Sequence, residues 1–220
     1  MLITTKYDSI LSRYGEKNGI PLPYLRALAK RESDMNPLSD MGPNGAKGIL
    51  QVIPVVRNDY NERHGTDYQS QDLFNPEICT MIAVDLLGRI LHAFSKHPCL
   101  EPDWRSSRWV ELFTFGWNAG YSEKAGVGFV VGKMEDRNTP CSQITIDTVS
   151  DYAGEVGASP YVARKDKVAW CKGVTSLYFR LAKMPQKNIS TVAGKTVKVA
   201  SFGLTLYAFA KLLEYLFKKE

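Results

Sequence analysis

The sequence contains little of what metal or cysteine chemistry requires. Its 220 residues include three histidines and four cysteines, which are His64, His92, His97, Cys79, Cys99, Cys141 and Cys171. No two cysteines form a CxxC pair, and no Cys/His group has the spacing of zinc ligands. We therefore expect no metal site and no cofactor. The cysteines allow one or two disulfides if the protein works outside the cytoplasm.

Long apolar runs and strong charge are also missing. No stretch approaches the roughly 18 uncharged apolar residues of a membrane span. The first residues, MLITTKYD, lack the basic region and the apolar stretch of a secretory signal, so we expect no signal peptide. The formal net charge of +5 favours encounter with polyanions only mildly, and a solvated surface explains it equally well. We expect a monomer with no nucleic-acid partner.

The sequence does contain helical periodicity. From residue 24 to residue 35, Leu25, Leu28 and Met35 recur on one face of a helix. The run Asn75-Pro76-Glu77 is typical of a helix start, with a capping side chain, a first-turn proline and an acid. Similar patterns predict further helices over 2–15, 49–60, 78–94, 109–117 and 161–182. Residues 121–160 are rich in glycine and give no clear pattern.

These patterns predict a mainly α protein with one main domain of about six helices over residues 1–183. Residues 184–198, rich in Lys, Thr and Asn, predict a linker. Residues 199–220 predict an added C-terminal amphipathic helix, with Phe202, Leu206, Phe209, Leu213 and Leu216 on one face. That helix either packs on the domain or binds a membrane surface or a partner protein.

Glu32 has an unusual place on its helix, because it lies on the apolar face one turn after Leu28. A carboxyl group on a buried face loses hydration, which raises its pKa. An acid that keeps its proton near neutral pH can protonate a leaving oxygen. The alternative is a solvated acid near the helix end, beside Lys30 and Arg31.

Several short motifs follow one another along the chain. They are Glu32-Ser33, Asn36-Pro37, Gly45-Ala46-Lys47-Gly48-Ile49-Leu50-Gln51 with Pro54 after it, Asn75-Pro76-Glu77, Trp117-Asn118-Ala119-Gly120 and Tyr161-Val162. Their order and spacing resemble the signature of the soluble lytic transglycosylase family. The resemblance covers roughly residues 7–182.

The resemblance implies a lysozyme-like (goose-type) helical domain with a sugar-binding cleft. It implies cleavage of the β-1,4 bond between N-acetylmuramic acid and N-acetylglucosamine in peptidoglycan. Glu32 would act first as the general acid and then as the base, while the muramic acid 6-hydroxyl closes onto C1 and leaves a 1,6-anhydro end. Such a reaction needs one switchable carboxyl group, whereas most glycosidases use two.

The resemblance also implies substrate contacts at Ser33, Gly48, Ile49, Leu50, Gln51, Trp117, Asn118, Ala119, Gly120 and Tyr161. A glycine lets the backbone approach a sugar closely, and the Gln51 amide offers a donor and an acceptor to the N-acetyl group or to Glu32. Other interpretations stay open. Gln51 could cap the next helix, Trp117 could belong to the core, and Tyr161 could begin a core helix.

The chain departs from the family pattern at a few positions. Gly42 stands where the family has a serine, and Ser39 could replace it. Trp117 replaces a tyrosine, which removes a hydroxyl contact. Gly157 stands where the family has a glutamate, and Glu155 is the nearest acid. These changes leave open whether water or the 6-hydroxyl is the acceptor.

Three other functions compete with a transglycosylase. A hydrolytic muramidase would need a second carboxylate, for which Asp103, Glu111 and Glu123 are candidates. An endopeptidase that cuts the peptide crosslinks would need a nucleophile, and Cys99 near His97 and His92 is the local candidate. A non-catalytic protein that binds the cell wall is the third.

Members of the family without a signal peptide are often phage lysins or conjugation accessory proteins, and the small size and divergent motifs of this chain look more like a phage lysin. By that resemblance, we expect an enzyme that acts in the periplasm or cell wall. It would be carried in a virion or released by a membrane-perforating partner.

Overall fold

The structure is a computed structural model that describes residues 5–40, 45–183, 191–192 and 195–196. The chain divides into two units, Met1–Met184 and Pro185–Glu220. In the second unit, β1 (Thr191–Val192) pairs antiparallel with β2 (Lys195–Thr196). The predicted C-terminal helix over 199–220 and most of the predicted linker over 184–198 lie outside the described residues.

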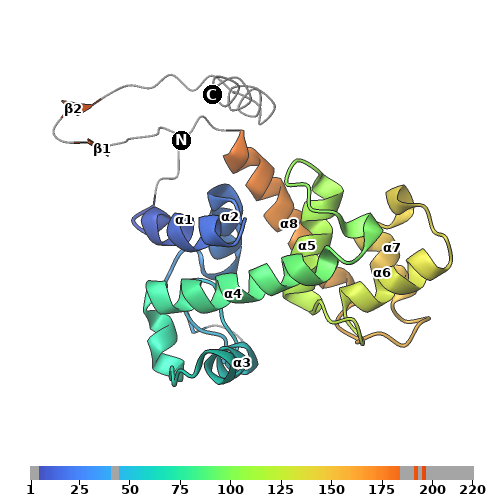
Figure 1. Ribbon diagram of the computed structural model, residues 1–220, viewed down its shortest axis with the longest axis horizontal. Coiled ribbons are helices and arrows are strands. Elements are labelled where there is room, and N and C mark those ends of the chain that lie inside the picture. Colours follow the sequence, from blue (N-terminus) through green and yellow to red (C-terminus); the bar gives the residue numbers. More distant parts are fainter. Residues whose placement is uncertain (1–4, 41–44, 184–190, 193–194, 197–220) are drawn as a thin grey trace, which may run out of the picture. The chain divides into compact units, whose positions relative to one another are not determined.

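The described part of the first unit is helical (Figure 1). Its elements in chain order are α1 (Asp8–Lys17), α2 (Leu22–Ser33), α3 (Pro54–His64), η1 (Ser70–Phe74), α4 (Pro76–Phe94), η2 (Pro98–Leu100), α5 (Ser107–Ala119), α6 (Val127–Asp136), η3 (Cys141–Gln143), α7 (Ile146–Tyr152) and α8 (Lys165–Ala182). The elements marked η are short 3-10 helices. The prediction of a mainly α fold is confirmed. Within the described ranges, no helix is both long and apolar enough to cross a membrane.

Side-chain caps determine where two of the long helices begin. The side chain of Asn75 accepts a hydrogen bond from the Glu77 N–H at 2.9 Å, and Pro76 is the first residue of α4. This confirms the helix start predicted from Asn75-Pro76-Glu77. The hydroxyl of Ser106 likewise accepts a hydrogen bond from the Trp109 N–H at 3.3 Å, so α5 begins at Ser107. Such caps satisfy backbone donors that a helix start leaves unpaired.

An aromatic cluster holds α2 against α5 and α8. Tyr24 of α2 is fully buried, with its ring centroid 5.0 Å from Trp104, 5.5 Å from Phe113 and 6.0 Å from Tyr178. Its hydroxyl lies 3.1 Å from the Thr114 hydroxyl, so the buried polar group is paired. In Figure 1, α8 runs beside α5, with α6 and α7 beyond them and α1 to α3 on the other side. The cluster anchors the first turn of α2, and the last turn of this helix carries Glu32.

The structure adds two helices, α6 and α7, in the region that gave no clear pattern. The sequence of α6, VGFVVGKMED, has valines and glycines, which have low intrinsic helix propensity. The helix buries Val127, Val130 and Val131 completely, so tertiary packing outweighs that propensity. Periodicity could not reveal this, because a short apolar run fits a strand equally well.

Three predicted helices begin later than expected. The helix predicted over 2–15 begins at Asp8, after a turn at residues 6 and 7. The helix predicted over 49–60 begins at Pro54, because residues before it form a turn that is closed by backbone hydrogen bonds between Lys47 and Val52. The helix predicted over 161–182 begins at Lys165, after an extended Arg164. Residues 49–53 and 161–164 therefore lie outside the helices predicted for them.

One disulfide joins Cys99 of η2 to Cys141 of η3, and Cys79 and Cys171 are buried thiols. The idea of Cys99 as a peptidase nucleophile is therefore wrong, because its sulfur is already bonded. The neighbouring His97 is also engaged. Its two ring nitrogens lie 2.8 Å from Glu135 and 2.9 Å from Glu123.

Candidate active site

Glu32 lies in the last turn of α2, and the next residue, Ser33, bonds this turn to the loop that follows. The hydroxyl of Ser33 donates a hydrogen bond to the backbone oxygen of Ile49 at 2.8 Å. Asp34 then takes a left-handed conformation, with φ of 57°, and ends the helix. The position of Glu32 therefore depends on both the helix and the loop around Ile49.

That loop, residues 45–53, is held by its own side chains and by close packing. Gln51 has a φ of 47°, and its Nε2 donates to the backbone oxygens of Ser39 at 3.1 Å and Gly48 at 3.0 Å. Gly48 has a φ of 80°, and a Cβ atom there would lie 2.0 Å from the backbone oxygen of Leu73. The loop thus requires glycine at this position for packing.

The C-terminal end of α5 lies against Glu32 and forms another wall of the site. The indole N–H of Trp117 donates a hydrogen bond to Oε1 of Glu32 at 2.7 Å. The tryptophan at this position offers no hydroxyl contact, as the sequence predicts. The structure adds that its indole nitrogen supplies a hydrogen-bond donor to Glu32 instead.

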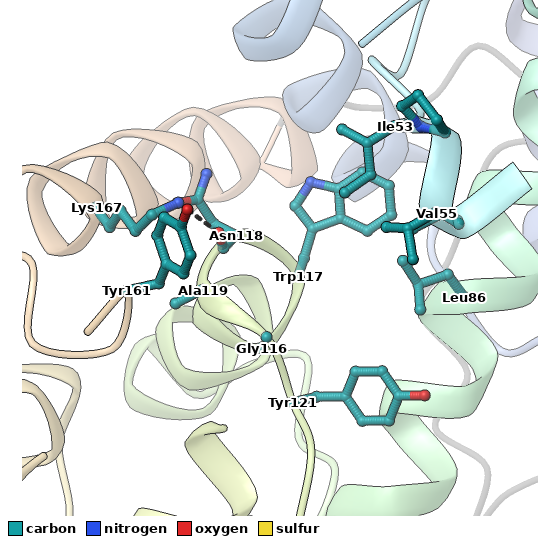
Figure 2. Close-up of a pocket in the computed structure, with 13 residues that line it drawn as sticks. Ile53, Val55, Leu86, Gly116, Trp117, Asn118, Ala119, Tyr121, Tyr161 and Lys167 are labelled. Carbon is teal, nitrogen blue, oxygen red and sulfur yellow. Dashed lines mark hydrogen bonds between the residues drawn. The ribbon is translucent and has the colours of Figure 1, made fainter. Parts of the chain in front are cut away.

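Two adjoining pockets form a cleft between these elements. The inner pocket, of about 340 Å³, is lined by Arg31, Glu32, Ala46, Gln51, Val52, Ile53, Val56, Leu86, Trp117, Asn118, Lys167 and Trp170. The outer pocket, of about 620 Å³, is lined by Ile53, Pro54, Val55, Val56, Leu86, Gly116, Trp117, Asn118, Ala119, Gly120, Tyr121, Tyr161 and Lys167 (Figure 2). Six residues line both pockets, so the two are continuous.

Burial dominates the protonation of Glu32. It raises the pKa of the carboxyl group from the ordinary value of 4.5 to about 7. The hydrogen bond from Trp117 and the positive charges of Lys167 and Arg31 favour the carboxylate and limit this rise. Near neutral pH the carboxyl group therefore exists in both forms, as a group that donates and later accepts a proton requires.

The structure brings together six of the residues that the sequence singled out as substrate contacts. Gln51, Trp117 and Asn118 line the inner pocket with Glu32. The outer pocket contains Trp117, Asn118, Ala119, Gly120 and Tyr161. Tyr161 is 55% exposed at the rim and precedes α8, so it does not begin a core helix.

Four of the expected contacts lie behind the wall of the cleft. Ile49 and Leu50 are fully buried in the core, and Ser33 is 7% exposed and bonded to the loop. Gly48 packs against Leu73 and lines neither pocket. The expectation of direct substrate contact is corrected for these residues. They shape the loop that positions Gln51 and Glu32.

Sequence patterns missed the part of the cleft that comes from other helices. Lys167 and Trp170 reach the inner pocket from α8, and Leu86 reaches it from α4. None of these three belongs to a motif, and no spacing relates them to Glu32. Arg31 was visible as the neighbour of Glu32, but nothing in its position predicted that it lines the pocket.

Among the carboxyl groups of the described residues, Glu32 alone lines either pocket. Asp103 lies in a surface hollow beside η2, and Glu123 is bonded to His97. Glu111 is half-buried on α5, outside the cleft. The three acids considered for a hydrolytic mechanism therefore lie away from the cleft.

Other positions where the sequence departs from the family pattern also lie outside the cleft. Ser39 is 4% exposed and lines neither pocket. Gly157 sits in a turn with a φ of 69°, and Glu155 lines a separate hollow beside Tyr152. Gly42 lies outside the described residues. Within the described ranges, no three His, Cys, Asp or Glu side chains gather closely enough to hold a metal ion.

Comparison with known proteins relates this architecture to one family. Residues 9–127 match the Transglycosylase SLT domain family. The structure is similar to the 70 kDa soluble lytic transglycosylase SLT70 from Escherichia coli, with a TM-score of 0.55 and 18% identity over 80% of this chain and 24% of that one. It is also similar to an inactive mutant of the lytic transglycosylase Slt from Pseudomonas aeruginosa, in which glutamine replaces a glutamate, with a TM-score of 0.53 and 14% identity over 82% of this chain and 25% of that one.

The chain thus spans about a quarter of the length of these two solved structures. At such identities the likeness concerns the fold, and it confirms the predicted lysozyme-like helical domain. No curated protein matches the chain. The family match covers more than half of the 220 residues, including Glu32 and the end of α5. The chain belongs to the Transglycosylase SLT domain family.

Proposed function

We propose that this chain cleaves the β-1,4 bond between N-acetylmuramic acid and N-acetylglucosamine in peptidoglycan, with Glu32 as its general acid and base. The observation that carries the proposal is the partly buried carboxyl group of Glu32, whose pKa is raised and which lines the cleft. Among the described residues, no other carboxyl group lines either pocket. Membership of the Transglycosylase SLT domain family supports the same function. So does the glutamate-to-glutamine change in the inactive Pseudomonas relative.

The first step is protonation of the leaving oxygen. Protonated Glu32 donates its proton to the glycosidic oxygen as the bond to C1 of muramic acid breaks. The carboxylate that remains accepts the indole N–H of Trp117 and lies in the field of Lys167 and Arg31. These contacts stabilise the charge that develops on Glu32, which lowers the free energy of the transition state.

The second step uses the same carboxylate as a base. It accepts the proton of the muramic acid 6-hydroxyl as that oxygen bonds to C1, so Glu32 regains its proton and a 1,6-anhydro end forms. A hydrolytic route would need a second carboxylate to hold a water molecule. The absence of such a group from the lining of the described cleft favours the intramolecular acceptor.

The disulfide favours work outside the cytoplasm. A bond such as Cys99–Cys141 persists in oxidising compartments, which fits the periplasm or the cell wall. Carriage in a virion, release by a membrane-perforating partner and attachment through residues 199–220 stay predictions from the sequence.

The proposal is tested by digesting purified peptidoglycan and analysing the products by mass spectrometry. We expect muropeptides with 1,6-anhydro ends. Glu32→Gln removes the proton and keeps the shape of the side chain, so we expect the rate to fall by about 10²- to 10⁴-fold. Glu111→Gln is the matched control, because burial also raises the pKa of this half-buried glutamate, yet it lines neither pocket.

Each other product would contradict a different part of the proposal. Reducing ends would indicate a muramidase and would exclude the intramolecular acceptor. Intact glycan strands with cut crosslinks would indicate a peptidase. Full activity of the Glu32→Gln variant would exclude Glu32 as the acid.

A further inference from the structure

Lys167 lies where the inner and outer pockets meet. It comes from the first turn of α8 and lines both pockets. Its Nζ donates to the backbone oxygen of Asn118 at 2.6 Å and to the side-chain Oδ1 of Asn118 at 2.8 Å (Figure 2). One lysine therefore holds both the main chain and the side chain of a residue in the cleft wall.

The hydrogen bond from Lys167 to the backbone oxygen of Asn118 stabilises the C-terminal end of α5. Asn118 is the residue before the last in α5, and the final carbonyl oxygens of a helix have no partner within the helix. These oxygens carry partial negative charge, so a cation at this end is stabilising. Lys167 thus fastens the turn of α5 that also carries Trp117, whose indole N–H contacts Glu32.

Lys167 differs from its neighbours on α8 in its charge partners. Lys165 pairs with Asp151, and Lys172 pairs with Asp147 at 2.7 Å. Among the described residues, no carboxylate forms an ion pair with Lys167. Burial and the nearby charge of Arg164 lower its pKa, so the site keeps a lysine at a cost in free energy. A partly buried cation without a carboxylate partner in the described part of the chain needs an explanation beyond stability.

The groups around Glu32 suggest what the cation does there. Arg31 and Tyr24 belong to α2, Cys79 to α4, Trp117 to α5, and Lys167 and Cys171 to α8. The tyrosine and the two thiols stay neutral, because burial raises the pKa of each. Arg31 is exposed, with its guanidinium 5.9 Å from the ring of Trp170. Lys167 is thus the more shielded of the two cations, and its charge is less screened by solvent.

We propose that Lys167 is the positioning residue of this site: it holds the last turn of α5 against Glu32 and supplies a positive charge to the inner pocket. The expected effect of Lys167 on catalysis rests on the proposed function. Its expected effect on the pKa of Glu32 does not. Removing the charge raises the pKa of Glu32, because a cation favours the carboxylate. An arginine keeps the charge and can still donate to Asn118.

The direct test is an NMR titration of the Trp117 indole N–H, which reports on the carboxyl group that it contacts. The four tryptophans give four indole signals, and a Trp117→Phe variant assigns the one in question. We expect its titration midpoint to move to higher pH in Lys167→Met and to stay near the wild-type value in Lys167→Arg. Lys172→Met is the matched control, since this lysine is exposed and paired with Asp147, and it should leave the midpoint unchanged.

Peptidoglycan cleavage provides the second readout. Glu32 must be protonated to act as an acid, so activity falls as the pH rises through its pKa. In Lys167→Met we expect this alkaline limb to move to higher pH, with a loss of roughly 10- to 100-fold at the optimum because Asn118 and Trp117 are less well held. Lys167→Arg should restore the limb and most of the rate.

A midpoint in Lys167→Met that equals the wild-type midpoint would overturn the inference, whatever the effect on rate. An equal shift in Lys172→Met would also overturn it, because any lost cation would then suffice. If Lys167→Met does not fold, Lys167→Gln takes its place, because the glutamine amide can still donate to Asn118 but carries no charge. A midpoint in Lys167→Gln equal to the wild-type midpoint would then overturn the inference. A wild-type protein without glycan-cleaving activity would contradict the proposed function. The NMR titration would then still decide whether Lys167 sets the protonation of Glu32.

Discussion

Opposing influences meet at the carboxyl group of Glu32. Burial favours the protonated form, whereas the indole N–H of Trp117 and two cations favour the carboxylate, and the resulting pKa is about 7. Trp117 is 85 residues away in sequence and reaches Glu32 from another helix. The balance suits a group that gives up a proton and takes one back within a single reaction.

The same balance predicts a cost in stability. Folding raises the pKa of Glu32 from 4.5 to about 7, so the folded protein holds this proton more tightly than the unfolded chain. The free energy of unfolding therefore decreases as the pH rises from 4.5 and reaches its full loss above about 7. We expect Glu32→Gln to be more stable than wild type at pH 8, by at most about 3 kcal/mol.

Thermal unfolding of both proteins between pH 4 and pH 8 checks this expectation. The difference in melting temperature should shrink as the pH falls towards the ordinary pKa of a glutamate. A variant that is less stable than wild type at pH 8 would show that Glu32 is not a strained acid.

At the scale of elements, the loop over residues 45–53 decides where the cleft can form. Its fold depends on Gly48, which packs against the backbone of Leu73, and on Gln51, which bonds two backbone oxygens. The wall opposite comes from the end of α5, and α8 reaches both pockets through Lys167. The motif residues in this loop mostly build the wall, and few of them face the cleft.

Replacing Gly48 and Gly65 by alanine distinguishes the cost of a steric clash from the cost of a left-handed backbone conformation. In Gly48→Ala, the new Cβ would meet the Leu73 backbone oxygen at 2.0 Å, so the loop must shift. We expect a loss of about 2–4 kcal/mol in the free energy of unfolding, together with weaker peptidoglycan cleavage, because Gln51 and Glu32 depend on this loop. Gly65→Ala is the control, since Gly65 also has a positive φ, of 63°, but has nothing within 4 Å of an added Cβ.

Urea unfolding measures both variants. Gly65→Ala should cost only about 1 kcal/mol, the penalty for the left-handed conformation. Equal losses in the two variants would show that the contact with Leu73 has no energetic importance.

At the scale of the whole molecule, the Cys99–Cys141 disulfide closes a loop that contains α5 and α6. The two cysteines are 42 residues apart, and η2 and η3 carry them. Because α5 ends in the cleft, the disulfide stabilises an element that carries Trp117 and Asn118. Small 3-10 turns alone would hold this connection weakly.

Removing the disulfide should lower stability without changing the chemistry of the site. For the double variant Cys99→Ser/Cys141→Ser, we expect a loss of about 2–4 kcal/mol and a lower melting temperature. Calorimetry with and without a reductant checks this. The reductant should destabilise wild type and leave the double variant unchanged, since Cys79 and Cys171 are already thiols. An equal effect on both proteins would contradict a stabilising role for the bond.

Sequence reasoning found much of the fold and the centre of the site. Helical periodicity located α2 and α4, and the cap at Asn75 gave the start of α4 to the residue. The apolar face of α2 identified Glu32 as a carboxyl group that would lose hydration. These features are local, because a cap and a helix face involve residues a few positions apart.

The sequence by itself therefore determined the helical class, the family pattern and the identity of the candidate acid. Only the tertiary structure decided which groups surround that acid. It placed Trp117 and Lys167 in one cleft with Glu32, moved Ser33, Ile49 and Leu50 behind the wall, and kept Asp103, Glu111 and Glu123 outside. The physical reason is that hydration, charge and hydrogen bonding at a site depend on neighbours in space, and three helices far apart in the chain supply those neighbours here.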